Sequence, residues 1–121
     1  MRVLQTRYFS KFTRKAGIRR ADLQDAIQRL SEGLIDANLG GGLFKQRIAR
    51  PGSGKSGGFR TILIFRLGDR AVFVYGFAKN VQANIDGQDL SDLRYLAKRV
   101  LSFTELELEE AVQAGDFLEV L

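Results

Sequence analysis

The sequence predicts an α+β fold: a small antiparallel β-sheet with two N-terminal helices packed on it, followed by C-terminal helices. Apolar residues recur at helical spacing before residue 36 and again after residue 86, whereas residues 43–77 hold three strand-like runs with short joins. With 121 residues, of which 45% are hydrophobic, the chain can bury one core. We therefore expect a single domain over residues 1–121.

The N-terminal region predicts one short strand and two helices. The strand is expected at about residues 2–6. The first helix should end at Gly17, and its apolar face carries Phe9, Phe12 and Ala16. The second helix is expected at about residues 20–35, with an apolar face of Leu23, Ala26, Ile27, Leu30 and Leu34. We expect the two helices to form a hairpin laid across the sheet.

The central region predicts an antiparallel meander of three strands. Residues 36–42 are rich in glycine and should break the second helix. Strands are expected at residues 43–50, 59–66 and 71–77. Residues 51–58, with the sequence PGSGKSGG, are expected to form a loop.

The C-terminal region predicts two further helices. Asp86 can cap the first of them, and Thr104 with Glu107 forms a capping box that opens the second. Residues 104–121 form an acidic extension. In one interpretation Leu106, Val112 and Phe117 close the core while the acids face water. In the other, the acidic segment covers a cationic face and acts as an electrostatic gate.

The net charge of +5 is unevenly distributed along the chain. Residues 1–66 carry 14 Lys/Arg against 4 Asp/Glu, a net +10, whereas residues 67–121 carry 5 against 10, a net −5. A basic body with an acidic tail indicates a polyanionic partner, with nucleic acid as the best match. The plainer interpretation is a soluble protein whose charges happen to be segregated in sequence.

The composition excludes several classes of site. The chain has no Cys and no His, which removes disulfides, thiolate metal sites and the usual general base at neutral pH. We expect neither a metal nor a cofactor. No apolar run approaches 18 residues, and residues 1–12 lack the apolar core of a signal peptide. We therefore expect no membrane span and a cytoplasmic location.

Residues 43–66 contain six basic residues and no acid, which makes this stretch the candidate functional centre. The six are Lys45, Arg47, Arg50, Lys55, Arg60 and Arg66. Because side chains alternate along a strand, Lys45 and Arg47 share one face, roughly 7 Å apart. Such a surface suits a chain of phosphates. The alternative is a solvated edge strand, which Lys and Arg commonly protect from pairing with other chains.

Residues 49–56, Ala-Arg-Pro-Gly-Ser-Gly-Lys-Ser, match a relaxed form of the phosphate-binding loop of nucleoside triphosphatases. A true loop of this class leads from a strand into a helix, whose N-terminus holds the phosphates. Here Gly57 and Gly58 lead into another predicted strand instead. We therefore do not expect triphosphate hydrolysis, although the N–H groups of the loop can still contact a phosphate.

Cleavage of RNA is a reaction that Lys and Arg can support without histidine. The 2′-hydroxyl must lose a proton, the phosphate must lie in line, charge must be stabilised, and the 5′-oxygen must be protonated. Cationic side chains stabilise the charge, and a lysine among other cations has a lowered pKa that suits a general base or acid. The candidate cluster is Lys45, Arg47, Lys55, Arg60 and Lys79.

Three segments carry a family resemblance: LFKQRIA, SGGFRTILIF and VYGFAKN. Together with the order of elements over residues 1–101, they resemble the RelE/ParE superfamily of bacterial toxins, and within it the RelE-like branch with its HigB-type members. The resemblance implies a small antiparallel sheet with two N-terminal helices packed on it. It also implies a ribosome-dependent endoribonuclease that cleaves mRNA, inhibits translation and is silenced by a partner antitoxin.

The resemblance also assigns roles to residues of this chain. The catalytic positions of the family fall on Lys45, Arg47, Arg60 and Lys79. Further RNA contacts are expected from Arg50, Lys55, Arg66 and Asn80. The chain departs from the family pattern at Asn80, where an arginine often stands, and near Asp86, where some members have a tyrosine. Two alternatives therefore stay open: a ParE-like toxin that poisons DNA gyrase, and an RNA-binding module without nuclease activity.

Overall fold

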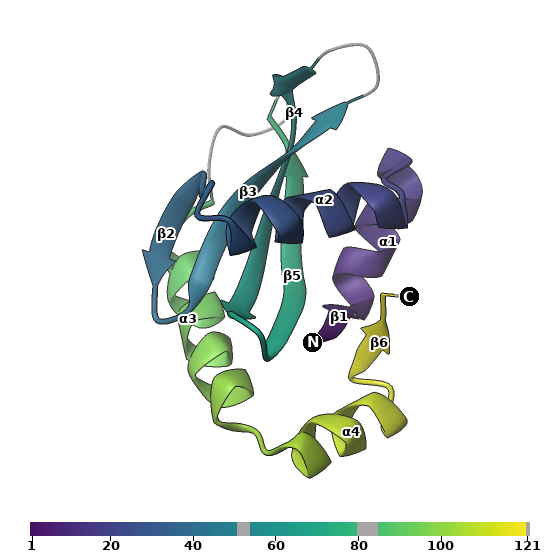
Figure 1. The fold of residues 1–121 in the computed structure, drawn as a ribbon, viewed down its shortest axis with the longest axis vertical. Helices are drawn as coiled ribbons and strands as arrows, with labels where there is room; N and C mark the ends of the chain where they lie inside the picture. The colour runs from purple at the N-terminus through teal and green to yellow at the C-terminus, as the bar shows by residue number, and fades with distance from the viewer. Residues whose placement is uncertain (51–53, 80–84, 121) are drawn as a thin grey trace.

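The computed structural model describes residues 1–50, 54–79 and 85–120, without the side chains of residues 50 and 54–57. Its fold is α+β, as the sequence predicts (Figure 1). The helices are α1 (Arg7–Ala16), α2 (Arg20–Ser31), α3 (Gly87–Ser102) and α4 (Glu105–Gln113). The strands are β1 (Arg2–Thr6), β2 (Ala37–Gly40), β3 (Leu43–Arg50), β4 (Gly54–Arg66), β5 (Arg70–Ala78) and β6 (Phe117–Glu119).

The described strands form one six-stranded sheet in the order β2-β3-β4-β5-β1-β6. Strands β3, β4 and β5 make the predicted antiparallel meander. Strand β1 pairs with β5 in parallel, from Arg2 opposite Arg70 to Gln5 opposite Phe73. Strand β6 pairs with β1 antiparallel. The sheet is therefore mostly antiparallel, with the two chain ends joined at one edge.

The alternation of side chains along the strands divides the core between two faces of the sheet. Helices α1 and α2 cover one face, where Phe9 stacks on Phe73 with ring centroids 5.0 Å apart (Figure 1). Helices α3 and α4 cover the other face, where Leu4, Val100 and Leu108 are fully buried. Burial of one such side chain contributes about 1.5–3 kcal/mol. The sheet is thus held between two apolar layers.

Local signals in the sequence explain where several helices begin and end. The hydroxyl of Thr6 accepts a hydrogen bond from the N–H of Phe9 at the start of α1, and Gly17 ends that helix with φ of 72°. Asp86 caps α3, and the predicted capping box opens α4. Each such cap contributes about 1 kcal/mol.

The predicted end of the second helix is wrong. The helix ends at Ser31 rather than residue 35, because the next residues are drawn toward β3 by the buried side chain of Gln46. The amide nitrogen of Gln46 donates to the carbonyl of Leu34, and its oxygen accepts from the N–H of Asp36. Residues 36–42 follow the helix as expected, and they contain a further strand, β2, which pairs with β3.

The expected glycine-rich loop at residues 51–58 is also shorter than predicted. Strand β4 begins at Gly54, which lies opposite Arg50 on β3. A glycine lacks a side chain to pack, but its backbone groups can still pair when a neighbouring strand extends beside it. Of the loop, residues 51–53 lie outside the described part of the chain.

The acidic extension packs at the β1 edge of the sheet. Leu108 and Phe117 are buried, whereas Leu106 is 68% exposed, so the expectation that Leu106 closes the core is wrong. Arg2 forms ion pairs with Glu109 and Glu119, and the Nε of Arg7 donates to the carbonyl of Gly115. These contacts support the packed alternative for this segment rather than the electrostatic gate.

Candidate functional site

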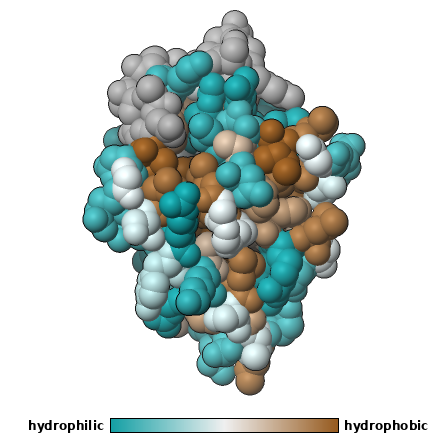
Figure 2. Space-filling view, turned by 90° about the vertical axis from the view of Figure 1, so that its left-hand side faces the viewer, coloured by the Kyte–Doolittle hydropathy of each residue, from teal (hydrophilic) through white to brown (hydrophobic). Residues whose placement is uncertain are grey.

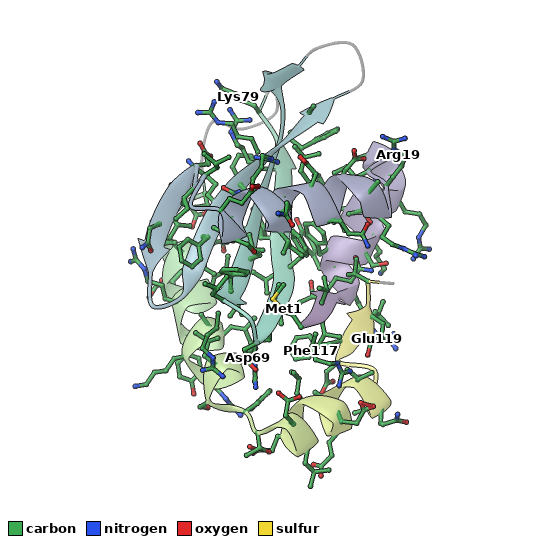
Figure 3. All side chains as sticks on the ribbon, viewed as in Figure 1. Met1, Arg19, Asp69, Lys79, Phe117 and Glu119 are labelled. Carbon is green, nitrogen blue, oxygen red and sulfur yellow. The ribbon has the colours of Figure 1, made fainter. Side chains whose placement is uncertain are left out.

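The register of the meander brings most of the predicted catalytic residues toward one end of the sheet. Arg47 on β3 lies opposite Arg60 on β4, and Arg60 lies opposite Phe77 on β5. Lys45 lies on the same face as Arg47, two positions along β3. Lys79 follows β5 directly, and its N–H donates to the carbonyl of Gly58 (Figure 3). The four predicted catalytic residues therefore come from β3, β4 and the residue after β5. Arg47, Arg60 and Lys79 lie toward one end of the sheet, whereas Lys45 lies nearer its middle, opposite Ile62.

An acidic residue, Asp36, lies within this cluster. Its Oδ1 is 2.8 Å from the Nε of Arg47, and its Oδ2 is 4.0 Å from the Nε of Arg60. Asp36 is not apparent as a site residue from the sequence, because it lies outside the basic stretch 43–66, in the segment that breaks the second helix. One signal could have found it: Asp36 is the single acid between Glu32 and Asp69, in the most basic part of the chain.

The backbone around Asp36 and Arg47 is held in place from the α2 side of the sheet. Gln46 is fully buried and donates to the carbonyls of Ala26 and Leu34, both at 3.1 Å, while accepting from the N–H of Asp36 at 2.8 Å. Arg29 donates from Nη2 to the carbonyl of Arg47 at 2.6 Å. A buried, satisfied network of this kind resists displacement. The carboxylate and its arginine partner are thus pre-positioned.

The cluster combines buried and accessible cations. The side chain of Arg60 is 6% exposed and that of Arg47 is 47% exposed. The Nη groups of Arg47 donate to no other residue in the described part of the chain. Four cations against the single carboxylate leave a net charge of +3 in this cluster. The arrangement can bind a phosphate and stabilise negative charge on it.

Three aromatic rings continue this site toward α1. Tyr8 on α1 stacks on Tyr75 of β5 with ring centroids 5.5 Å apart and an interplanar angle of 11°. Tyr75 in turn contacts Phe77 at 6.0 Å. Burial raises the pKa of Tyr8, with smaller contributions from Tyr75 and from Asp89 near the start of α3. The sequence has no tyrosine near Asp86, and the stacked tyrosine pair of the fold is formed instead by Tyr8 of α1 and Tyr75 of β5.

The remaining predicted site residues lie elsewhere or cannot be placed. Arg66 is at the opposite end of β4, where it pairs with Asp69 and donates to the carbonyl of Leu101. The structure does not bring it to the cluster. The side chains of Arg50 and Lys55, and the whole of Asn80, lie outside the described residues. Within the described residues, no group of three or more His, Cys, Asp or Glu is placed to hold a metal ion.

The surface on the side of β2 and α3 shows hydrophilic residues gathered toward the upper end, with hydrophobic residues on both sides of them (Figure 2).

None of the helices, as far as the chain is described, is long and apolar enough to cross a membrane.

Comparisons with known proteins agree with the resemblance. The family model of the RelE toxin of the RelE/RelB toxin–antitoxin system matches residues 1–120. A search of curated proteins finds no significant match. The match covers almost the whole chain, including every strand of the sheet and the residues of the cationic cluster. The protein therefore belongs to the RelE toxin family, the toxin side of a toxin–antitoxin system.

Proposed function

We propose that this toxin is a ribosome-dependent endoribonuclease that cleaves mRNA in the cytoplasm and is silenced by a cognate antitoxin. The observation that carries the proposal is the cross-strand pair of Arg47 and Arg60, held beside Asp36. Two guanidinium groups from adjacent strands can together contact the non-bridging oxygens of one phosphate. The family membership supplies the toxin role, and this pair supplies the chemistry.

The reaction in the proposal is an in-line transesterification that needs no metal. The 2′-oxygen attacks the adjacent phosphorus, the bond to the 5′-oxygen breaks, and a 2′,3′-cyclic phosphate forms. Arg47 and Arg60 stabilise the negative charge that develops on the phosphate oxygens. Lys45 and Lys79 are the candidates for moving the proton from the 2′-oxygen and delivering one to the 5′-oxygen.

Asp36 acts as a positioning residue in this proposal. Its Oδ1 accepts from the Nε of Arg47, which orients the guanidinium while leaving both Nη groups for a ligand. Loss of the carboxylate should therefore weaken phosphate binding through Arg47 without removing any direct contact to RNA. An incoming phosphate meets a prepared site, which lowers the entropic cost of binding.

Mapping of mRNA ends in a translating extract tests the proposal. The purified protein should produce new ends within translated codons, and it should produce none when ribosomes are omitted. Inhibition of gyrase without new mRNA ends would identify the ParE-like alternative. Binding to RNA or ribosomes without either activity would identify a module that has lost nuclease function. A matched control is Arg20→Ala, which removes one exposed cation from α2 and should leave cleavage unchanged.

A further inference from the structure

On the side away from β4, the last residues of β5 border a groove rather than another strand. Strand β1 pairs with β5 only as far as Phe73, because the chain turns into α1 at Arg7. Helix α1 then runs beside the remainder of β5 and leaves a groove of about 370 Å³. Its lining includes Tyr8, Phe12, Lys15, Phe59, Gly76 and Phe77.

The floor of the groove is rigid and apolar. A Cβ atom added to Gly76 would meet the ring of Phe12 at 2.4 Å, so α1 packs directly on the β5 backbone here. Phe12 also contacts Phe59 edge-on, with ring centroids 5.8 Å apart. A floor built this way keeps its shape when a ligand arrives, since the packed rings cannot fill the groove themselves.

One wall of the groove offers an accessible aromatic face. Tyr8 stacks on Tyr75, yet 55% of Tyr8 stays exposed. Stacked rings accept a further flat ring readily, because offset stacking is favourable for each added pair. The exposed part of Tyr8 is therefore where a planar ligand would extend the stack.

Phe77 links the groove to the cationic cluster, although most of the groove lining belongs to the α1 side of the sheet. Arg60 lies opposite Phe77, which lines the groove, and Arg47 lies one strand further. Neighbouring strands are about 4.8 Å apart, so the groove begins within about 10 Å of Arg47. Lys15 on the groove wall and Lys79 after β5 add positive charge on this side. A phosphate at the arginines would carry its neighbouring nucleotide to the groove.

We propose that this groove binds a nucleobase of single-stranded RNA, stacked on Tyr8, from the nucleotide next to the phosphate held by Arg47 and Arg60. The inference rests on the proposed function and adds to it a residue for base binding. Flat aromatic walls, flanking cations and the proximity of Phe77 to Arg60 together match a nucleotide, whereas an apolar peptide would gain nothing from Lys15. Stacking tolerates any base, so the groove selects for the presence of a base more than for its identity.

The test compares two RNA probes on the full chain at low salt. One is an eight-nucleotide RNA with 2′-O-methyl groups, which cannot be cleaved because the nucleophile is blocked. The other has the same backbone with its central bases removed. The wild-type protein should prefer the intact probe by about tenfold. Tyr8→Ala should bind both probes equally, while Tyr8→Phe, which keeps the ring, should retain the preference.

Two controls separate the groove from the rest of the site. Tyr95→Ala removes a tyrosine that is 63% exposed on α3, away from the groove, and should keep the preference. Arg47→Ala should weaken both probes to the same extent, because it acts on the phosphate. Circular dichroism confirms that each variant is folded.

A second readout uses the absence of tryptophan from the chain. Tyr8→Trp places a single indole at the groove, and the intact probe should quench its fluorescence while the abasic probe does not. A wild-type protein without preference, or Tyr8→Ala with full preference, would overturn the groove assignment. Cleavage of mRNA is measured separately. A base preference without cleavage would refute the proposed function alone, and cleavage without base preference would refute the groove alone.

Discussion

Two arginine clusters lie along β4, one at its Arg66 end and the other around Arg60 near its middle, and they differ in where their hydrogen bonds go. Figure 3 marks the side of the first cluster with Asp69 and the side of the second with Lys79. At the Asp69 end, the side chain of Arg70 is 3% exposed and donates to Asp69 and to the carbonyls of Val100 and Phe103, and it pairs with Glu105. Those carbonyls lie at the C-terminus of α3, where a cation is electrostatically favoured.

In the cluster around Arg60, Arg47 has one carboxylate partner and remains half exposed. The Nε of Arg47 donates to Asp36, while its Nη groups have no acceptor in the described part of the chain. Arginine side chains are thus used in two ways in this protein. An arginine whose donors all meet acceptors of the protein joins a helix to a sheet, and an arginine that is oriented but not saturated is available to a ligand.

The largest effect expected from breaking this contrast is at the accessible end. Lys45→Ala/Arg47→Ala should reduce mRNA cleavage by about 10³-fold or more and abolish toxicity, because two groups that hold charge on the phosphate are lost. Stability should fall by about 1–3 kcal/mol, because Asp36, whose side chain is only 10% exposed, loses its ion-pair partner. Growth after induction and mRNA cleavage measure the loss of activity, and thermal melting measures the change in stability. Growth arrest by the folded double variant would contradict the assignment.

Arg70→Met should have the reverse effects, a large loss of stability with unchanged activity. It keeps the length and apolar stem of the side chain but leaves the carbonyls at the end of α3 and the carboxylate of Asp69 without their donor. Loss of one partner of a buried charged network costs about 3–4 kcal/mol. Urea denaturation measures this loss, and activity per folded molecule should not change. Arg66→Met at the same turn is the matched control, because Arg66 is 49% exposed and should cost about 1 kcal/mol or less.

Arg60→Lys tests whether the geometry of the guanidinium matters or only its charge. A lysine cannot present two parallel donors to two phosphate oxygens. Cleavage should fall by about 100-fold although the charge is kept. Single-turnover cleavage of mRNA on ribosomes measures the effect. Wild-type cleavage by this variant would reduce Arg60 to a general electrostatic role.

The strands with strong patterns were predicted well from the sequence. The strands predicted at residues 43–50 and 71–77 are found at Leu43–Arg50 and Arg70–Ala78, because aromatic and β-branched side chains report directly on burial in a sheet. Strands β2 and β6 were missed, since they are short and exist through pairing with a neighbour. Strand β6 pairs with β1 at the other end of the chain, and β2 lies in a glycine-rich segment, so neither strand has a local hydrophobic pattern that predicts it.

The site was predicted in part for the same reason. Alternation along β3 places Lys45 and Arg47 on one face, which sequence can show. Strand register decides the end of the sheet at which Arg66 lies. The packing of helices and strands decides the contacts of Asp36 and Tyr8. A basic residue in a strand is visible in a sequence, but the acceptors that satisfy it become visible only in the fold.

The smallest expected effect is the pH dependence of the folding stability that Asp69 contributes. Burial alone would raise the pKa of Asp69, but hydrogen bonds from Arg70 and Arg66 outweigh it and lower the pKa below its ordinary value. A lowered folded-state pKa means that the ionised carboxylate stabilises the fold. This contribution is complete above the unfolded pKa of about 3.9 and is lost as pH falls through the folded value.

Asp69→Asn should therefore be less stable than wild type at pH 6, by about 0.5–1 kcal/mol because the pair is partly solvent-screened, and the difference should vanish at acidic pH. Urea denaturation between pH 6 and pH 2 measures both proteins. Asp36→Asn is the informative comparison, since it alters the carboxylate beside Arg47 and Arg60 and should reduce cleavage at every pH. A constant stability difference down to pH 2 would show that Asp69 contributes through packing rather than charge, and the contrast between the two clusters would then rest on Arg70 alone.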